Sequence, residues 1–63
     1  MSVFFAASTT YENNRIIEYH IEQVLCQSKP KSSIVKGDNL IHKKQYFQSD
    51  FEAFECIRSQ LSN

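Results

Sequence analysis

The sequence contains only one glycine, one proline and no tryptophan. The low glycine and proline content argues against a phosphate-binding loop and against a disordered chain. A single glycine, Gly37, disfavours the glycine-rich loops that cradle phosphate groups, and neither G-x-x-x-x-G-K nor G-x-G-x-x-G occurs. The low glycine and proline content is also unlike that of low-complexity, disordered chains. We therefore expect a folded protein without a phosphate-binding loop.

Cysteine is scarce too, since Cys26 and Cys56 stand far apart with no C-x-x-C pattern. Zinc sites usually show closely spaced ligand pairs, and these cysteines with His20 and His42 provide none, so we expect no metal and no cofactor. The apolar run from Val3 to Ala7 is too short for a secretion signal or a membrane span. The sequence therefore predicts a cytoplasmic protein with reduced thiols and no membrane association.

The chain of 63 residues predicts one domain, residues 1–63. A domain of this size buries only about 60% of its unfolded surface, so its core is small. Five phenylalanines and three tyrosines concentrate that core in a few large side chains. We expect no room for an enclosed reaction centre, and hence a protein that is not an enzyme.

The second half of the sequence predicts a β-hairpin. Residues 32–36 and 39–47 are rich in β-branched and aromatic side chains. A type II′ turn at Gly37-Asp38 would pair Val35 with Leu40, because glycine accepts a positive φ without steric cost. A type I′ turn at Asp38-Asn39 is the alternative, and it would shift this pairing.

A helix is predicted over residues 50–61, directly after the hairpin. Ser49 and Glu52 have the S-x-x-E spacing of a capping box, in which each residue bonds the other's backbone N–H. At 100° per residue, four apolar side chains fall within one broad arc that we expect to face the core: Phe51, Phe54, Ile57 and Leu61.

The first half predicts a strand over residues 2–7 and a helix that is clear from Ile17 to Gln27. The strand is apolar on both faces, as is typical of a strand inside a sheet. In the helix, Ile17, Ile21, Val24 and Leu25 would share a face. Its start is open between Thr9 and Asn14, since the T-x-x-E run from Thr9 or either asparagine could cap it.

Together these elements predict an α+β fold with the order β-α-β-β-α. We expect a three-stranded mixed sheet with both helices on one face and a right-handed parallel crossover through the first helix. One face of the sheet then lacks a helix layer. Phe4 would be partly exposed there, or a second copy of the chain would cover it, so Phe4 is a candidate dimer or partner surface.

Charge is balanced overall but unevenly distributed. Residues 29–44 contain five lysines and one aspartate, a net charge of +4, whereas the segments before and after each carry −2. The candidate binding residues lie on the hairpin: Lys36, His42, Lys43, Lys44 and Tyr46. They could follow a nucleic-acid backbone or an acidic protein, or they could be solvated lysines that protect a sheet edge from aggregation.

Catalytic chemistry has little support in the sequence. His20 lies at the edge of an apolar pattern and could act as a base, but no partner in the sequence completes a triad or a metal set, and one hydrogen bond would satisfy it as a structural residue. Neither cysteine has the electropositive surroundings that a nucleophilic thiolate requires. We therefore assign no catalytic residue.

These observations favour a small, non-enzymatic regulator or inhibitor that acts by protein–protein interaction, of the size found among phage, plasmid and bacterial accessory proteins. We expect a protein partner, with homodimer formation as one form of it, because edge strands pair readily with another chain. The alternative is a nucleic-acid-binding protein that uses the basic hairpin.

Overall fold

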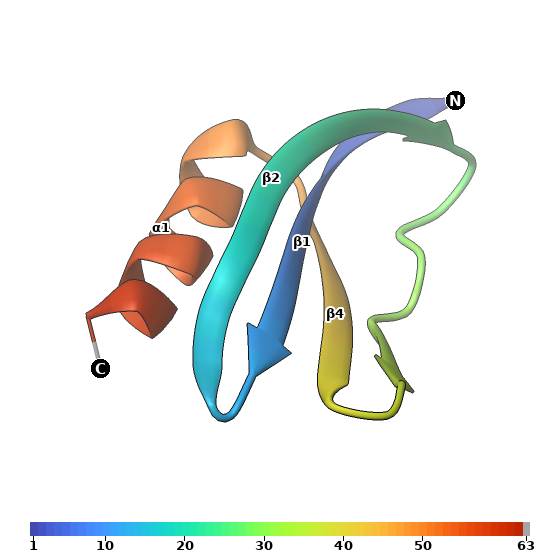
Figure 1. The fold of residues 1–63 in the computed structure, drawn as a ribbon. Coiled ribbons are helices and arrows are strands. Elements are labelled where there is room, and N and C mark those ends of the chain that lie inside the picture. The colour runs from blue at the N-terminus through green and yellow to red at the C-terminus, as the bar shows by residue number, and fades with distance from the viewer. Residues whose placement is uncertain (63) are drawn as a thin grey trace.

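A computed structural model describes residues 1–62 and shows a four-stranded antiparallel sheet with one helix packed on one face (Figure 1). The elements in chain order are β1 (Ser2–Glu12), β2 (Arg15–Cys26), β3 (Ser33–Lys36), β4 (Leu40–Phe47) and α1 (Asp50–Leu61). The strands lie in the order β2-β1-β4-β3. The α+β class is retained, but the expected three-stranded mixed sheet with two helices is wrong.

The expected first helix is strand β2 instead. The segment supports both patterns, because Ile17, Ile21 and Val24 suit a helix face while Ile17, Tyr19 and Ile21 alternate as in a strand. Isoleucine, valine and tyrosine favour strands, where their side chains pack against cross-strand neighbours. The pairing of β2 with β1 along nearly its whole length decides between the two periods.

Two asparagines make the turn between β1 and β2. Asn13 and Asn14 have φ values of 52° and 65°, and they separate the paired residues Glu12 and Arg15. Two consecutive positive φ values are the signature of a type I′ turn, whose twist matches that of the flanking strands. These asparagines therefore join two strands, and the expectation that one of them caps a helix is wrong.

β1 is one of the two interior strands, with β4, and is longer than the predicted segment 2–7. It pairs with β2 from Ser2↔Cys26 to Glu12↔Arg15 and with β4 from Phe5↔Phe47 to Glu12↔Leu40, in both cases antiparallel. No parallel crossover connects the strands of residues 1–62. The β1–β2 register shifts once, between Thr10 and Tyr11, and such a bulge adds bend and twist to a strand. β2 is strongly curved in Figure 1.

The hairpin of β3 and β4 is confirmed, with the register of the alternative two-residue turn at Asp38-Asn39 but without the positive φ values of a type I′ turn. Lys36 pairs with Ile41 and Val35 with His42, so the expected pairing of Val35 with Leu40 is wrong. The Gly37 N–H donates to the Leu40 carbonyl over 2.7 Å. Positive φ values within residues 1–62 occur only at Asn13 and Asn14, so this turn is neither type II′ nor type I′.

Helix α1 has the predicted bounds and the predicted N-cap. The Ser49 hydroxyl accepts a hydrogen bond from the Glu52 backbone N–H over 3.2 Å. The Glu52 carboxylate accepts from the Ser49 hydroxyl over 3.3 Å, in place of the backbone bond expected for a full capping box. Asp50 and Glu52 also place negative charge beside the positive end of the helix dipole.

The buried side of α1 is not the expected one. Ala53 and Ile57 are buried against the sheet, whereas Phe51, Phe54 and Leu61 are largely exposed. Ala53 brings the helix backbone close to β1, where Ala7 is the facing small residue of the same core cluster. Phe5, Ile21 and Phe47 pack around that cluster. The prediction that all the large apolar residues of α1 form the core is therefore wrong.

Polar side chains attach the C-terminal half of α1 to the sheet. The Tyr11 hydroxyl donates to Gln60 Oε1, and the Gln60 amide nitrogen lies 3.4 Å from Gln45 Oε1. The Cys56 thiol donates to the same Gln45 oxygen over 3.0 Å. Cys56 therefore faces β4, and both Cys26 and Cys56 are free thiols.

The sheet face without the helix also buries two residues of β1. Phe4 and Ala6 of β1 are buried there, with exposed fractions of 6% and 0%. The chain itself covers Phe4, which leaves little of this side chain for a partner to contact. Among residues 1–62, no helix has the length and hydropathy needed to cross a membrane.

Candidate functional site

The five candidate residues of the basic hairpin are divided between the two faces of the sheet. Side chains alternate along a strand, and residues paired across strands share a face. Lys43 pairs with Thr9, and Lys36 shares the next helix-side row with Ile41 and Tyr11. The opposite face carries His42, Lys44 and Tyr46. The structure therefore brings His42, Lys44 and Tyr46 together on one face and separates them from Lys36 and Lys43.

Three of these side chains already have partners within the chain. Lys43 Nζ lies 4.9 Å from the centroid of the Tyr11 ring, a cation–π geometry. Lys44 Nζ lies 3.8 Å from Glu22 Oε1, and His42 Nδ1 lies 3.0 Å from Thr10 Oγ1. The Glu22 carboxylate therefore offsets the charge of Lys44. A phosphate backbone would meet a mixed surface here, not a continuous basic one.

His20 lies on the face opposite the helix, in a row that crosses all four strands. The row consists of His20, Ser8, Lys44 and Ser33, and it lines an open hollow with Tyr46 and His42. The Ser8 hydroxyl is buried without a hydrogen-bond partner in the described residues. Within residues 1–62, no set of three or more histidine, cysteine or acidic side chains could hold a metal ion.

Exposed apolar side chains gather instead along the boundary between β2 and α1. This β2–α1 surface consists of Tyr19 and Ile21 from β2 with Phe51 and Phe54 from α1. Tyr19, Phe51 and Phe54 are 53%, 68% and 53% exposed, and Ile21 is partly buried. Ile21, Phe51 and Phe54 line one shallow hollow together with Asp50. Contiguous exposed aromatic groups of this kind are typical of interaction sites.

The fold explains why these side chains are exposed. Tyr19 and Ile21 share the helix-facing side of β2, opposite Thr9 and Ala7 of β1. α1 packs over β1 through Ala53 and Ile57, so its Phe54 flank projects toward the outermost strand and not into the core. The sequence pattern assigned Ile21, Phe51 and Phe54 to the interior, because each lies on the apolar arc of an expected helix.

β2 also forms an unpaired edge of the sheet. It spans twelve residues and is paired only with β1 in the described part of the chain, so one side of its backbone has no strand partner. β3, at the opposite edge, has only four residues. Short strands and lysines protect edges from further pairing, and β3 with Lys36 fits that description better than β2 does. The long edge therefore adjoins the apolar surface.

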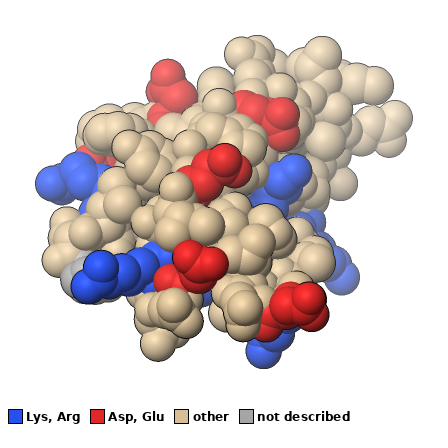
Figure 2. Space-filling model, in the orientation of Figure 1, with Lys and Arg blue, Asp and Glu red and all other residues tan. Residues whose placement is uncertain are grey.

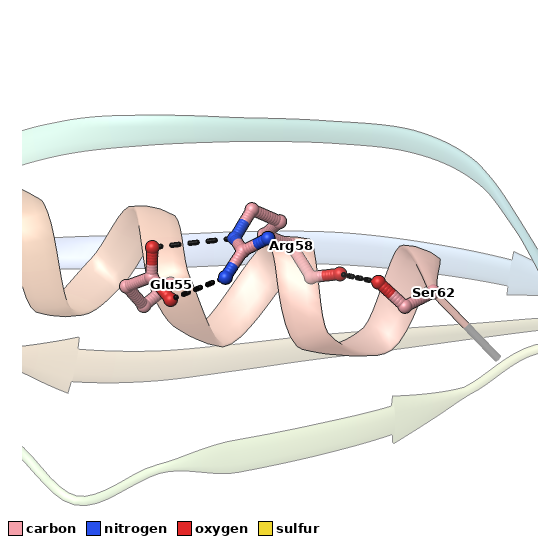
Figure 3. Close-up of polar contacts among 3 residues, drawn as sticks. All are labelled: Glu55, Arg58 and Ser62. Carbon is pink, nitrogen blue, oxygen red and sulfur yellow. Dashed lines mark hydrogen bonds and ion pairs between the residues drawn. The ribbon is translucent and has the colours of Figure 1, made fainter.

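Acidic and basic side chains are interspersed over the view of the molecule in Figure 2. Arg58 of α1 forms a two-point contact with Glu55, with nitrogen–oxygen distances of 3.3 and 3.1 Å (Figure 3). The hydrogen bond and then the charge of Glu55 raise the pKa of Arg58 above its ordinary value. The guanidinium is thus held beside its own helix.

The Arg58 carbonyl accepts a hydrogen bond from the Ser62 hydroxyl (Figure 3). It also accepts one from the Ser62 backbone N–H, and together these bonds close the C-terminal end of α1. Both ends of the helix that presents Phe51 and Phe54 are therefore capped. The β2–α1 surface combines a fixed helix flank with an open strand edge. Comparisons with models of protein families, with curated proteins and with solved structures give no match to this chain.

Proposed function

We propose that this protein is a small, non-enzymatic regulator or inhibitor that acts by binding another protein chain, and that the β2–α1 surface makes the contact. The observation that carries the proposal is the exposure of Tyr19, Phe51 and Phe54 beside an unpaired strand. Aromatic side chains dominate the energetics of protein interfaces, because they bury large areas at low entropic cost. An open strand edge adds backbone hydrogen bonds to the same contact.

Burial of this surface would supply a substantial driving force. Each apolar side chain of this size contributes about 1.5–3 kcal/mol when it is fully removed from water. Phe51 and Phe54 retain more than half of their exposed area in the free chain, so most of that contribution is still available for binding. The two residues lie one turn apart on a helix with capped ends, which limits the entropy lost on binding.

The test compares the proteins retained by immobilised wild-type chain and by two double variants. Phe51→Ser with Phe54→Ser removes the aromatic groups of the β2–α1 surface. Ile34→Ser with Val35→Ser is the matched control, because those two residues are 60% exposed on the opposite edge strand. We expect a partner that is retained by wild type and by the control but lost by the phenylalanine variant, with folding of each checked by circular dichroism.

The opposite pattern would contradict the proposal. If the phenylalanine variant remains folded and retains the same proteins as wild type, the β2–α1 surface does not make the contact. Loss of retention only in the control variant would move the binding site to the β3 edge.

A further inference from the structure

The charged and apolar residues of the β2–α1 surface are arranged so that two copies of this surface can pair with each other. We propose that the partner is a second copy of this chain, paired antiparallel along β2 about a two-fold axis at Ile21. The inference rests on the proposed use of the β2–α1 surface and adds the identity of the chain that covers it. The result would be a continuous eight-stranded sheet with both α1 helices on the same face.

Charge along β2 disfavours the two registers on either side of one centred on Ile21. A pairing centred on Ile21 sets His20 opposite Glu22 of the other copy, and the two-fold axis makes this contact twice. A pairing centred on His20 would set Glu18 against Glu22 twice, and one centred on Glu22 would set that carboxylate against itself. Like charges directly opposite each other destabilise a strand pair, whereas opposite or hydrogen-bonding pairs stabilise it.

The apolar residues agree with the same register. Ile21 meets Ile21 of the second copy at the axis, and Val24 lies opposite Glu18, where it can cover the methylene groups of that side chain. Residues 18–24 all fall within the regular part of the β1–β2 ladder, on one side of the bulge at Thr10/Tyr11. A pairing centred on Tyr19 would instead place the bulged segment, including Ile17, near its middle.

The position of α1 provides a second reason for this axis. Ile21 shares its shallow hollow with Phe51 and Phe54, so an axis through Ile21 brings the two copies of this hollow face to face. The aromatic groups left exposed in the single chain would then be covered by the same contact that pairs the strands. A dimer of ordinary size buries about 800 Å² on each partner, roughly a sixth of the 4837 Å² exposed by this chain.

The primary test is the mass in solution, measured by sedimentation equilibrium up to high micromolar concentration. We expect wild type to approach twice the 7.4 kDa mass of the chain as concentration rises. His20→Glu should raise the dissociation constant by about tenfold, because it places two carboxylates opposite each other twice. His20→Glu combined with Glu22→Gln replaces the facing carboxylates by a carboxylate–amide pair, without placing a lysine beside Lys44, and should return the constant to within about threefold of wild type.

A matched control uses the other edge of the sheet. Val35→Glu introduces the same charge at an exposed position of β3 and should leave the dissociation constant unchanged. Amide hydrogen exchange locates the contact, since protection of residues 19–23 should increase with protein concentration while that of β3 does not. A wild-type chain that stays monomeric, or a double variant that remains as weak as His20→Glu, would overturn the inference.

These outcomes separate this inference from the proposed function. In one outcome the wild-type chain is monomeric, yet it retains a protein that is lost when Phe51 and Phe54 are substituted. A different chain then occupies the β2–α1 surface. In another outcome the dimer forms equally well after replacement of Phe51 and Phe54, and the double variant at positions 20 and 22 does not restore binding. Self-association then uses another surface.

Discussion

Single residues determine where the chain reverses direction, and Asn13 and Asn14 are the clearest case. Both have positive φ values, a conformation that costs most residues about 1–2 kcal/mol but that asparagine tolerates. The sequence contained this signal, because two adjacent asparagines between β-branched runs suit a type I′ turn. The same residues are also good helix caps, and that interpretation was preferred when a helix was expected to follow.

Replacement of Asn14 by alanine should therefore weaken the fold. We expect Asn14→Ala to lower the free energy of unfolding by about 1 kcal/mol, because alanine pays the full steric cost of a positive φ. Asn39→Ala is the matched control, since Asn39 lies in the other turn without a positive φ and should change stability little. Urea unfolding of the two variants measures the difference, and equal effects would contradict this account.

Ile57 and Phe51 of α1 should respond in opposite ways to truncation. Ile57 is 2% exposed in the core, so Ile57→Ala should cost about 2–5 kcal/mol through lost burial and the cavity left behind. Phe51 is 68% exposed, and Phe51→Ala should stay within about 0.5 kcal/mol of wild type under monomeric conditions. Thermal or urea unfolding at low protein concentration compares them. A large loss for Phe51→Ala would mean that it supports the core after all.

At the scale of elements, local sequence signals predicted the secondary structure of the second half of the chain correctly. They predicted a helix in the first half where the structure has β2. The α1 helix was predictable from Ser49 through Leu61, because its cap is a local interaction between Ser49 and Glu52. The hairpin of β3 and β4 was predictable for a similar reason, although its turn type was not. β2 could not be settled locally, since its residues fit a period of 3.6 and a period of 2, and pairing with β1 decides between them.

The candidate site followed from the fold more than from the sequence. Lys43 and Lys44 are adjacent in sequence and so looked like one patch, but strand alternation sends them to opposite faces. Phe51 and Phe54 looked like core residues because their exposure depends on where α1 crosses the sheet. Burial of Ala53 in place of a larger residue determines that crossing, and an alanine carries little weight in a hydrophobic pattern.

The N-cap of α1 offers a direct test at this scale. Ser49→Ala removes the hydroxyl that accepts from the Glu52 backbone N–H and should lower the free energy of unfolding by about 1 kcal/mol. Ser59→Ala makes the same chemical change at an exposed position inside the helix, where alanine is the better helix former, and should be neutral or slightly stabilising. Unfolding curves for the pair should therefore separate, and coincident curves would contradict the capping role.

For the whole molecule, the distribution of charge bears on the nucleic-acid alternative. Lys43→Ala with Lys44→Ala and Lys29→Ala with Lys31→Ala remove the same total charge from different places. Because Lys43 and Lys44 lie on opposite faces and Lys44 is near Glu22, we expect both double variants to behave alike on DNA and RNA columns across a salt gradient. A specific loss of retention in the Lys43/Lys44 variant would instead support binding through the hairpin.

The interior position of β1 has a consequence for how the protein is assembled during its synthesis. β1 and β2 are neighbours in sequence and can pair as soon as both have left the ribosome, whereas the other side of β1 must wait for β4, which ends at Phe47. A nascent chain that stops short of Phe47 therefore carries the β1–β2 hairpin with one side of β1 unpaired. Synthesis of β4 and then of α1 completes first the ladder beside β1 and then the helix layer above it.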